Sequence, residues 1–572
     1  MNKFFLFTVF FYSTFSFAQQ SYIDYVSPFH PVVGSSGMVV SQNHLSSEIG
    51  IAILNKGGNA VDAAVAVGFS LAITLPRAGN LGGGGFMLVY LKEKKEIFYI
   101  DYRSNSPLNS NIQDLFGTNL PRDYKKTDFN KSKYGYKASA VPGTVAGLLE
   151  AHENFGKLPL AEIMEPVIEQ AKKGILVSYD LSQAIASTPQ LLNDPESKSI
   201  YFKDGKPLAE NSLMQRPDLA KTLTAIALNG TKGFYEGEIA QKIVDAMNTN
   251  NGFMRLYDFK NYKVNAGAPI SIAYRGNTVF APGAPSGGGV VLLTALNILS
   301  KYKFREEDSN STRTYHLLAE SLRRGHNNRS HHIGDPSFYD VPMTQLISKQ
   351  RADELQSSIK FKKATPSSKI KPLEVVNESR DTTHYSIIDS DGNAVSNTYT
   401  LGYSFGSGVT IPGTGILMNN QMNNLAYRYG DASVDGRAAS TGNKFEPGKR
   451  PMSTMTPTMV FNQKGELTLI TGSPGGSFIP AAVLRVVSGI IDFDLNIGEA
   501  TMLSRIHKDW PYTGLDYEST LSSDIARQLD AMGHKPEPQK TMGSTQSIHI
   551  KNGFNYGYAD LRRPGAKVAI QK

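Results

Sequence analysis

The chain has 572 residues, of which 40% are hydrophobic and 19% charged, and this length suggests more than one domain. The composition is typical of a globular protein and excludes a disordered or fibrous one. There is no cysteine, which excludes disulfides, thiolate catalysis and cysteine-bound metal centres. The net charge of +8 comes from Lys and Arg spread along the whole chain, so a solvated basic surface is favoured over a nucleic-acid site.

The N-terminal residues have the pattern of an export signal. Lys3 gives a positive start, the following run to Phe17 is almost entirely apolar, and Ser16-Phe17-Ala18 has the form of a cleavage site. The run is short for a permanent membrane anchor, although an uncleaved anchor is the alternative. We therefore predict a signal peptide over residues 1–18, a periplasmic or secreted mature protein, and no membrane span after signal removal.

Two helices and a strand are expected in the first part of the mature chain. Residues 46–73 have helical character, interrupted by the stop signal Gly57-Gly58. The run Gly82–Gly85 then leads into an expected strand over residues 86–90. This glycine run lacks the Lys-Ser/Thr of a phosphate loop, and we interpret it as close packing of backbone.

A further helix is expected over residues 315–324, and three histidines follow it. They are His326, His331 and His332. Their spacing fits no zinc motif and no carboxylate pattern accompanies them, so a polar helix end is favoured over a metal site.

An exposed linker is expected over residues 361–381, which are polar and lack hydrophobic periodicity. Directly after it, residues 383–388 are predicted to be a strand, and Asp389–Gly392 is a hairpin signal. Residues 393–400 form the expected returning strand. Such a junction between an exposed linker and a buried hairpin is suited to cleavage of the chain.

Thr382 stands at this junction. Cleavage before it would create an N-terminal threonine, whose α-amine has an ordinary pKa of about 7.7–8.0 and can accept the hydroxyl proton during attack on a carbonyl. In the precursor, the same hydroxyl would attack the Asp381 carbonyl, and the resulting ester would hydrolyse. The residues alone leave ordinary packing of β-branched side chains as the alternative.

Motifs along nearly the whole mature chain resemble those of the γ-glutamyltranspeptidase family. Their order and spacing together are highly specific. Before the junction they are Gly57–Ala64, Gly79–Phe86, Val141–Gly147 and Gly334–Pro336. From the junction onward they are Thr382–Ser386, Asp391–Val395, Leu417–Met422, Lys449–Ser453, Thr471–Gly476, Met542–Gln546 and Asp560–Arg563.

The resemblance implies an α+β fold of the N-terminal-nucleophile hydrolase type, a four-layer αββα sandwich. It also implies a zymogen that cuts itself into a large subunit, residues 19–381, and a small subunit, residues 382–572, which stay associated. The implied activity is that of a γ-glutamyltransferase or glutathione hydrolase, which needs no cofactor or metal. Its substrates are γ-glutamyl compounds such as glutathione, cleaved through a threonine ester, with water, an amino acid or a dipeptide as acceptor.

The resemblance also assigns catalytic roles. Thr382 is the implied nucleophile, and Thr400 would orient its hydroxyl. The backbone N–H groups of Gly475 and Gly476 would stabilise the developing oxyanion, where glycine leaves the approach open.

Substrate-binding roles follow from the same resemblance. Arg103 would clamp the donor α-carboxylate bidentately, with the hydroxyls of Ser453 and Thr454 as further donors. Gln421 would accept from the donor α-ammonium group.

Two positions depart from the family pattern. Gly402 stands where relatives carry Asn or Glu, and Asn424 stands where they carry Asp; both positions help to hold the α-ammonium group in the family. A hydrogen bond to a charged group is worth about 1.5–3 kcal/mol, so recognition of the ammonium is expected to weaken. The alternative functions are therefore cephalosporin-acylase-like hydrolysis of glutaryl amides, which lack this amino group, and a catalytically silent binding homologue.

Two loops leave further alternatives. Residues 425–448 are Gly-rich and polar and lie where many relatives have a lid, so they form either a lid or an ordinary surface loop. The run Gly402–Gly406 fits the G-x-S-x-G elbow of serine hydrolases around Ser404. No helix pattern follows it, so Ser404 is disfavoured as a nucleophile.

Overall fold

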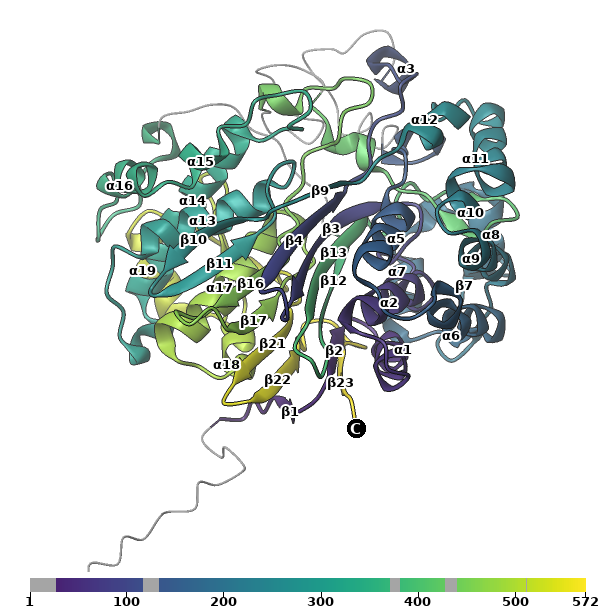
Figure 1. Cartoon of the computed structure of the whole chain (residues 1–572). Helices are drawn as coiled ribbons and strands as arrows, with labels where there is room; N and C mark the ends of the chain where they lie inside the picture. The colour runs from purple at the N-terminus through teal and green to yellow at the C-terminus, as the bar shows by residue number, and fades with distance from the viewer. Residues whose placement is uncertain (1–26, 117–132, 371–380, 427–439, 511) are drawn as a thin grey trace, which may run out of the picture.

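The computed structural model describes residues 27–116, 133–370, 381–426, 440–510 and 512–572 (Figure 1). The predicted signal peptide, residues 371–380 of the predicted linker and most of the possible lid lie outside the described residues.

Within the described residues, two seven-stranded antiparallel sheets form the centre of the molecule (Figure 1). The first sheet has the spatial order β23 (Lys567–Ile570), β2 (Met38–Ser41), β12 (Asp381–Ile388), β13 (Ala394–Gly402), β3 (Gly84–Leu91), β4 (Glu96–Tyr102) and β9 (Asn265–Gly267). The second has the order β1 (Val32–Gly34), β22 (Phe554–Ala559), β21 (Gln546–Lys551), β17 (Leu467–Thr471), β16 (Thr458–Phe461), β11 (Asn277–Ala281) and β10 (Ile270–Tyr274).

One helical layer covers the outer face of the first sheet (Figure 1). The helices that contact its strands are α1 (His44–Asn55), α2 (Ala60–Thr74) and α5 (Thr144–Phe155). Beyond them lie α6 (Leu160–Lys173), α7 (Tyr179–Ala186), α8 (Pro195–Tyr201), α9 (Pro217–Asn229), α10 (Lys232–Tyr235), α11 (Gly237–Thr249) and α12 (Leu256–Asn261). The short pairs β5 (Ile175–Leu176) with β8 (Leu213–Met214), β6 (Phe202–Lys203) with β7 (Lys206–Pro207), and β14 (Thr410–Ile411) with β15 (Ile416–Leu417) complete the described strands of this part.

A second helical layer lies on the second sheet. It consists of α13 (Gly287–Leu299), α14 (Thr312–His332), α15 (Met343–Leu346), α16 (Lys349–Ser357), α17 (Ile479–Phe493), α18 (Ile497–Met502) and α19 (Ser523–Ala531). A small sheet of β18 (Ile506–His507), β19 (Leu515–Glu518) and β20 (Pro536–Gln539) lies beside it, and α3 (Ile112–Phe116) lies at the top of Figure 1. Two sheets between two helical layers confirm the predicted αββα sandwich.

The hydrophobic core has two main parts, because alternate side chains along a strand point to opposite faces of the sheet. In β3, Met87 and Val89 belong to the cluster packed under the first helical layer, whereas Phe86, Leu88 and Tyr90 belong to the cluster that includes the second sheet. Every residue of α2 is buried, which its small and apolar side chains allow. The predicted hairpin is confirmed as β12 and β13, and the predicted first helices are confirmed as α1 and α2.

The start of α2 explains the motif Gly57–Ala64. The Asn59 side chain accepts from the backbone N–H groups of Val61 and Asp62, and the Asp62 carboxylate accepts from the Asn59 N–H at 3.0 Å, which forms a capping box. The buried Asp62 also accepts from the Leu158 N–H at 3.1 Å. These residues fix the helix that supports the centre of the first sheet.

Helix α14 combines a polar sequence with deep burial. Its Glu320 lies between Arg323 and Arg324, and the Thr365 hydroxyl donates to the Glu320 carboxylate at 2.6 Å. Burial raises the pKa of this carboxyl, but the charges of the two arginines outweigh burial and lower the pKa to about 2.

This anchoring corrects the prediction of an exposed linker. Ala364, Thr365 and Ile370 are buried, and Ile370 packs on Trp510. Most other residues of 361–370 are exposed as predicted, so the expectation was wrong only at these three residues. Their partners come from α14 and the C-terminal third of the chain, which sequence order does not place next to them.

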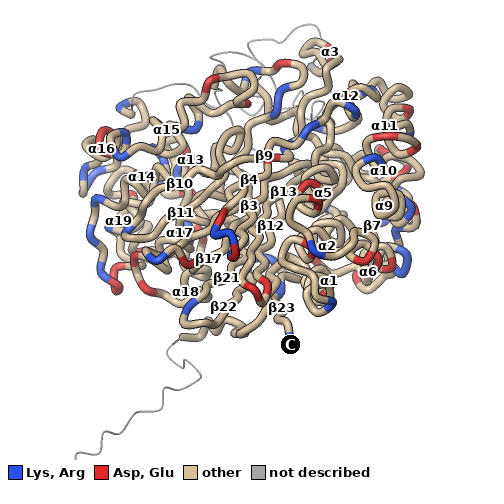
Figure 2. The backbone as a smooth tube through the Cα atoms, in the orientation of Figure 1, with Lys and Arg blue, Asp and Glu red and all other residues tan. Residues whose placement is uncertain are grey.

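Charged residues lie mainly on the outer helices and loops, where blue and red segments are interspersed in the view of Figure 2. Among the described residues, one helical stretch, Gly476–Phe493, is long and apolar enough to cross a membrane. Because 83% of it is buried between other elements, its environment is that of a core helix.

Candidate active site

The predicted cleavage junction lies at the start of β12, in the middle of the first sheet. Asp381 pairs with Gly402 of β13 and Thr383 with Tyr399, and a bulge separates the two pairs. Thr382 therefore lies in the bulge, beside Thr400 and Leu401 of the neighbouring strand. Only 2% of Thr382 is exposed.

Thr400 is fixed on both its side chain and its carbonyl. Its hydroxyl accepts from the Gly402 N–H at 2.9 Å, and its carbonyl accepts from Nε2 of Gln421 at 2.7 Å. A Cβ at Gly83 would lie 2.1 Å from the Thr400 carbonyl oxygen. The prediction that the glycine run permits close backbone packing is confirmed, and the run packs directly behind this threonine.

Arg103 follows β4 and is buried, with 1% exposure. Its guanidinium donates to neutral oxygens: the Pro451 carbonyl at 3.1 Å, Oδ1 of Asn424 at 3.1 Å and the Met452 carbonyl at 3.4 Å. A buried guanidinium whose acceptors among the described residues are neutral oxygens suits the binding of an anionic group from a substrate.

An ion pair between Asp101 and Arg450 holds the end of β4, next to Arg103. Asp101 accepts from the Arg103 N–H at 2.8 Å and from Nη1 of Arg450 at 2.6 Å. The Arg450 N–H donates in turn to Asp335 at 2.7 Å. Two of the motifs that carry the family resemblance, Gly334–Pro336 and Lys449–Ser453, thus meet at the end of β4.

Ser453 and Thr454 lie between α13 and the end of β17. The Ser453 carbonyl accepts from the Gly287 N–H at 2.6 Å, at the start of α13. The Thr454 hydroxyl donates to the Gly476 carbonyl at 2.8 Å. The Gly475-Gly476 turn has φ angles of +130° and +57°, which glycine adopts without strain.

The structure links several of the predicted site residues along one path of contacts, which begins at Thr400 beside Thr382. From Thr400 the path runs to Gln421, then through the short 3₁₀ turn Gln421–Asn424 to Arg103. It continues from Arg103 through the Pro451 carbonyl along the chain to Thr454 and Gly476.

The two positions that depart from the family pattern have defined environments. Gly402 has φ +105°, and a Cβ there would lie 2.1 Å from Oδ1 of Asn420. Asn420 is fixed in place, because its Oδ1 accepts from the Tyr403 N–H at 3.0 Å and its Nδ2 donates to the Gly406 carbonyl at 2.9 Å. Asn424 uses its Oδ1 to accept from Arg103, so its acceptor already serves the guanidinium.

Gln421 offers a different acceptor. Its Oε1 is buried and has no hydrogen-bond partner among the described residues, whereas its Nε2 is occupied by the Thr400 carbonyl. A buried carbonyl oxygen of this kind is suited to accept from an ammonium group.

His384, two residues after Thr382, lies between the sheets. Its ring contacts the hydroxyls of Thr398 at 2.8 Å and Ser386 at 3.1 Å. Burial lowers its pKa to about 3, so the ring is neutral at ordinary pH. A Cβ at Gly472 would lie 2.4 Å from this ring, which explains the glycine that precedes the Ser473–Gly476 turn.

The structure also bears on the competing sites. β13 ends at Gly402, and the residues up to Gly408 form turns rather than the helix that a serine elbow requires around Ser404. The helix predicted over residues 315–324 runs on to His332, so His331 and His332 lie at its end as expected, whereas His326 lies inside α14 and is buried. Among the residues that the structure describes, no three or more His, Cys, Asp or Glu side chains form a group that could hold a metal ion.

Two asparagines that the sequence did not single out help to build the site. Asn443 donates to the Asn424 carbonyl at 2.7 Å and accepts from the Met452 N–H at 2.8 Å, so it holds two of the three residues whose oxygens accept from Arg103. Asn420 fixes the turn after Gly402. The run Asn419-Asn420-Gln421 was a visible signal for Asn420, but Asn443 lies in a Gly-rich segment without such a signal.

Known proteins match this chain over most of its length. The γ-glutamyltranspeptidase family matches residues 46–570. The chain is 40% identical over 538 residues to the glutathione hydrolase proenzyme of Escherichia coli (strain K12), covering 93% of this chain and 92% of the relative. It is 34% identical over 553 residues to the acylase ACY 1 proenzyme of Pseudomonas sp. (strain SE83), covering 96% of each.

Among solved structures, the cephalosporin acylase of Bacillus halodurans superposes with a TM-score of 0.83 at 27% identity, covering 97% of this chain and 99% of that one. Fold and site thus define an N-terminal-nucleophile hydrolase. The chain belongs to the γ-glutamyltranspeptidase family.

Proposed function

We propose that the chain is an exported precursor that cuts itself before Thr382 and then hydrolyses or transfers γ-glutamyl groups from compounds such as glutathione. The observation that carries the proposal is the path of contacts that joins Thr400, which lies beside Thr382 in the first sheet, to the buried guanidinium of Arg103 and the Gly475-Gly476 turn. The acceptor is water, an amino acid or a dipeptide.

Self-cleavage begins in the bulge of β12. The Thr382 hydroxyl oxygen attacks the Asp381 carbonyl carbon, the C–N bond breaks, and an ester and a free Thr382 amine result. Water then hydrolyses the ester, which leaves a new carboxylate on Asp381. The product would be a large subunit of residues 19–381 and a small subunit of residues 382–572.

In turnover, the Thr382 amine accepts the hydroxyl proton while the oxygen attacks the γ-carbonyl of the donor. The N–H groups of Gly475 and Gly476 stabilise the oxyanion, and each such donor is worth about 3–4 kcal/mol. The leaving amine takes the proton as the C–N bond breaks, and an acyl-threonine ester remains. Water or an acceptor amine then attacks the ester and restores the hydroxyl.

Donor recognition would combine both charges of the glutamyl group. Arg103, with the hydroxyls of Ser453 and Thr454, binds the α-carboxylate. The Oε1 atom of Gln421 accepts from the α-ammonium, which supplies the partner that this buried oxygen lacks among the described residues.

The test is Thr382→Ala in the full chain, with Thr383→Ala as the matched control. The Thr383 hydroxyl is buried without a hydrogen-bond partner among the described residues, so its removal breaks no bond. Thr382→Ala is expected to remain uncut and inactive towards a γ-glutamyl anilide, whereas Thr383→Ala is cut and active. An active, cut Thr382→Ala protein would refute the assignment. N-terminal sequencing of the large subunit tests export, with Gln19 as the expected first residue.

A second candidate function is the hydrolysis of glutaryl amides. Two observations favour it: Gly402 has no room for a side chain beside Asn420, and the Asn424 oxygen already serves Arg103. The acylase relatives are consistent with it. A comparison of kcat/KM for γ-glutamyl and glutaryl anilides distinguishes the two candidate functions, since these substrates differ only in the amino group. Strong preference for γ-glutamyl supports the main proposal, and equal or better glutaryl cleavage supports the second.

A further inference from the structure

The peptide planes of the Gly475-Gly476 turn have identifiable contacts on their carbonyl sides. In a trans peptide the carbonyl and the following N–H point in opposite directions, so a contact that fixes the carbonyl also aims the N–H. The Ser473 hydroxyl donates to the Pro474 carbonyl at 2.7 Å, which fixes the plane that contains the Gly475 N–H. The Phe478 N–H donates to the Gly475 carbonyl at 3.1 Å, which fixes the plane of the Gly476 N–H.

A second loop, Met542–Thr545, holds the Ser473 hydroxyl in this orientation. The Ser544 N–H donates to Oγ of Ser473 at 3.0 Å, so the Ser473 proton is directed to the Pro474 carbonyl. Both Ser473 and Ser544 are fully buried. Because the hydroxyl accepts one bond and donates the other, polarisation along the chain strengthens both bonds.

The two loops also touch through their backbones. A Cβ at Gly475 would lie 3.1 Å from Cα of Gly543, and a Cβ at Gly543 would lie 2.6 Å from Oγ of Ser473. Gly543 has φ +75°, a conformation that favours glycine. The loop therefore forms a close support behind the turn.

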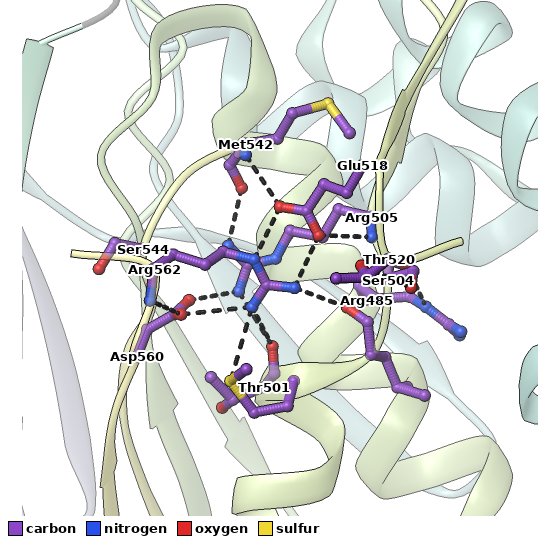
Figure 3. Close-up of polar contacts among 12 residues, drawn as sticks. Arg485, Thr501, Ser504, Arg505, Glu518, Thr520, Met542, Ser544, Asp560 and Arg562 are labelled. Atoms are coloured by element: carbon purple, nitrogen blue, oxygen red, sulfur yellow. Dashed lines mark hydrogen bonds and ion pairs between the residues drawn. The ribbon is translucent and has the colours of Figure 1, made fainter. Parts of the chain in front are cut away.

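A buried charged network fixes both ends of this loop (Figure 3). At the first end, the Met542 N–H donates to Glu518 at 2.9 Å, and Arg505 donates to the Met542 carbonyl at 2.7 Å. At the other end, the Thr545 N–H donates to Asp560 at 2.9 Å, and Arg505 donates to the same carboxylate at 2.6 Å.

Arg562 completes the network. It binds both oxygens of Glu518 at 2.7 Å and contacts Asp560 at 3.2 Å (Figure 3). Burial raises the pKa of the Asp560 carboxyl, but the charges of Arg505 and Arg562 outweigh it, and the pKa lies below its ordinary value. The network thus consists of two cations, Arg505 and Arg562, and two anions, Glu518 and Asp560, which bind the loop or each other.

We propose that this network acts on catalysis through the loop Met542–Thr545, and that Ser473 is the positioning residue that aims the Gly475 N–H at the oxyanion. This inference rests on the proposed function, in which the Gly475 N–H stabilises that oxyanion. The Ser473 hydroxyl bonds the Pro474 carbonyl and the Ser544 N–H, neither of which is assigned to donor binding or to nucleophilic attack. Its effect should therefore appear in the transition state and not in the binding of the ground state.

The experiment uses Ser473→Ala in the full chain, with Ser547→Ala as the matched control. Ser547 makes a buried hydroxyl contact with Thr471 at 2.7 Å, next to the same loops but outside the turn. Three values are measured on the cut enzyme: kcat/KM for the anilide, Ki for the free acid product, and Ki for a phosphonate analogue of the tetrahedral intermediate.

For Ser473→Ala we expect kcat/KM to fall about tenfold, below the loss from deleting an oxyanion donor outright. The phosphonate Ki should rise by the same factor, while the product Ki stays within twofold. Ser547→Ala should leave all three values within twofold. Arg562→Lys, which keeps the charge but loses the paired contact with Glu518, should show the same pattern with a smaller change.

Unchanged kcat/KM in folded Ser473→Ala would overturn the inference, and so would an equal rise of both Ki values, which indicates general loosening of the site. If Ser473→Ala does not fold, Arg562→Lys decides by the same pattern. A wild-type chain that neither cuts itself nor releases the chromophore refutes the proposed function instead, so the two failures are distinguishable.

Discussion

A carboxylate at position 424 should restore discrimination in favour of the amino group of the donor. Asn424→Asp preserves the size of a side chain that is 4% exposed and whose oxygen lies 3.1 Å from Nη2 of Arg103. The backbone is held independently, because the Asn424 carbonyl accepts from Asn443 at 2.7 Å. The substitution therefore changes charge with little change in shape.

The magnitude follows from the charge that only one substrate carries. Two unit charges about 4 Å apart at an effective dielectric constant of about 20 interact by about 4 kcal/mol, and desolvation of the new carboxylate offsets part of this. A net value of about 1.5–3 kcal/mol is typical of a hydrogen bond to a charged group. Any change in the clamp by Arg103 affects both substrates and cancels in their ratio.

The assay is the ratio of kcat/KM for γ-glutamyl over glutaryl anilide. Asn424→Asp should raise this ratio about tenfold to a hundredfold, since about 1.4 kcal/mol corresponds to a factor of ten. Asn423→Asp, which adds the same charge one residue earlier, controls for a general effect of charge. A ratio within twofold of wild type, with both substrates still cleaved, would show that the α-ammonium does not bind near residue 424.

Gly402→Asn should not restore recognition of the amino group and should lower kcat/KM for both anilides, because its Cβ would lie 2.1 Å from Asn420 and a strained φ costs about 1–3 kcal/mol. Gly83→Ala should block self-cleavage, because a Cβ at residue 83 would lie only 2.1 Å from the Thr400 carbonyl oxygen and would force it to move. Gel analysis of the purified chain checks this, and normal cleavage would contradict this account of Thr400. Glu320→Gln should lower the free energy of unfolding at pH 7 by about 3 kcal/mol, since the folded pKa of about 2 lies below the ordinary 4.5 and each unit is worth about 1.4 kcal/mol. The contribution of Glu320 is present above pH 4.5 and disappears as pH falls towards 2, so denaturant titrations should show the wild type and variant converging below pH 4.5; a constant difference would contradict the pKa.

Local patterns predicted much of the first sheet. The alternation around Asp389–Gly392 identified the hairpin of β12 and β13, and Gly57-Gly58 marked the break between α1 and α2. These signals are local, because turn residues and apolar periodicity act within a few positions.

What the sequence could not show is which polar groups meet across the fold. The composition of α14 is that of a surface helix, yet Glu320 and its arginines are buried, where the Thr365 hydroxyl donates to Glu320 and the Leu355 carbonyl accepts from Arg324. The Asn424 departure could be located from the family pattern, but only the structure shows its oxygen on Arg103. The Glu320–Thr365 contact joins residues 45 positions apart and the Asn424–Arg103 contact residues 321 apart, and no local periodicity encodes either.

The order of strands has a consequence for the cut enzyme. In the first sheet, β12 and β13 from the proposed small subunit lie between β2 and β3 from the large one, and the second sheet likewise contains strands from both. Two such chains cannot separate without rupture of backbone ladders in both sheets. Labelled and unlabelled molecules should therefore never trade subunits while folded, and the nicked protein should melt in a single cooperative step.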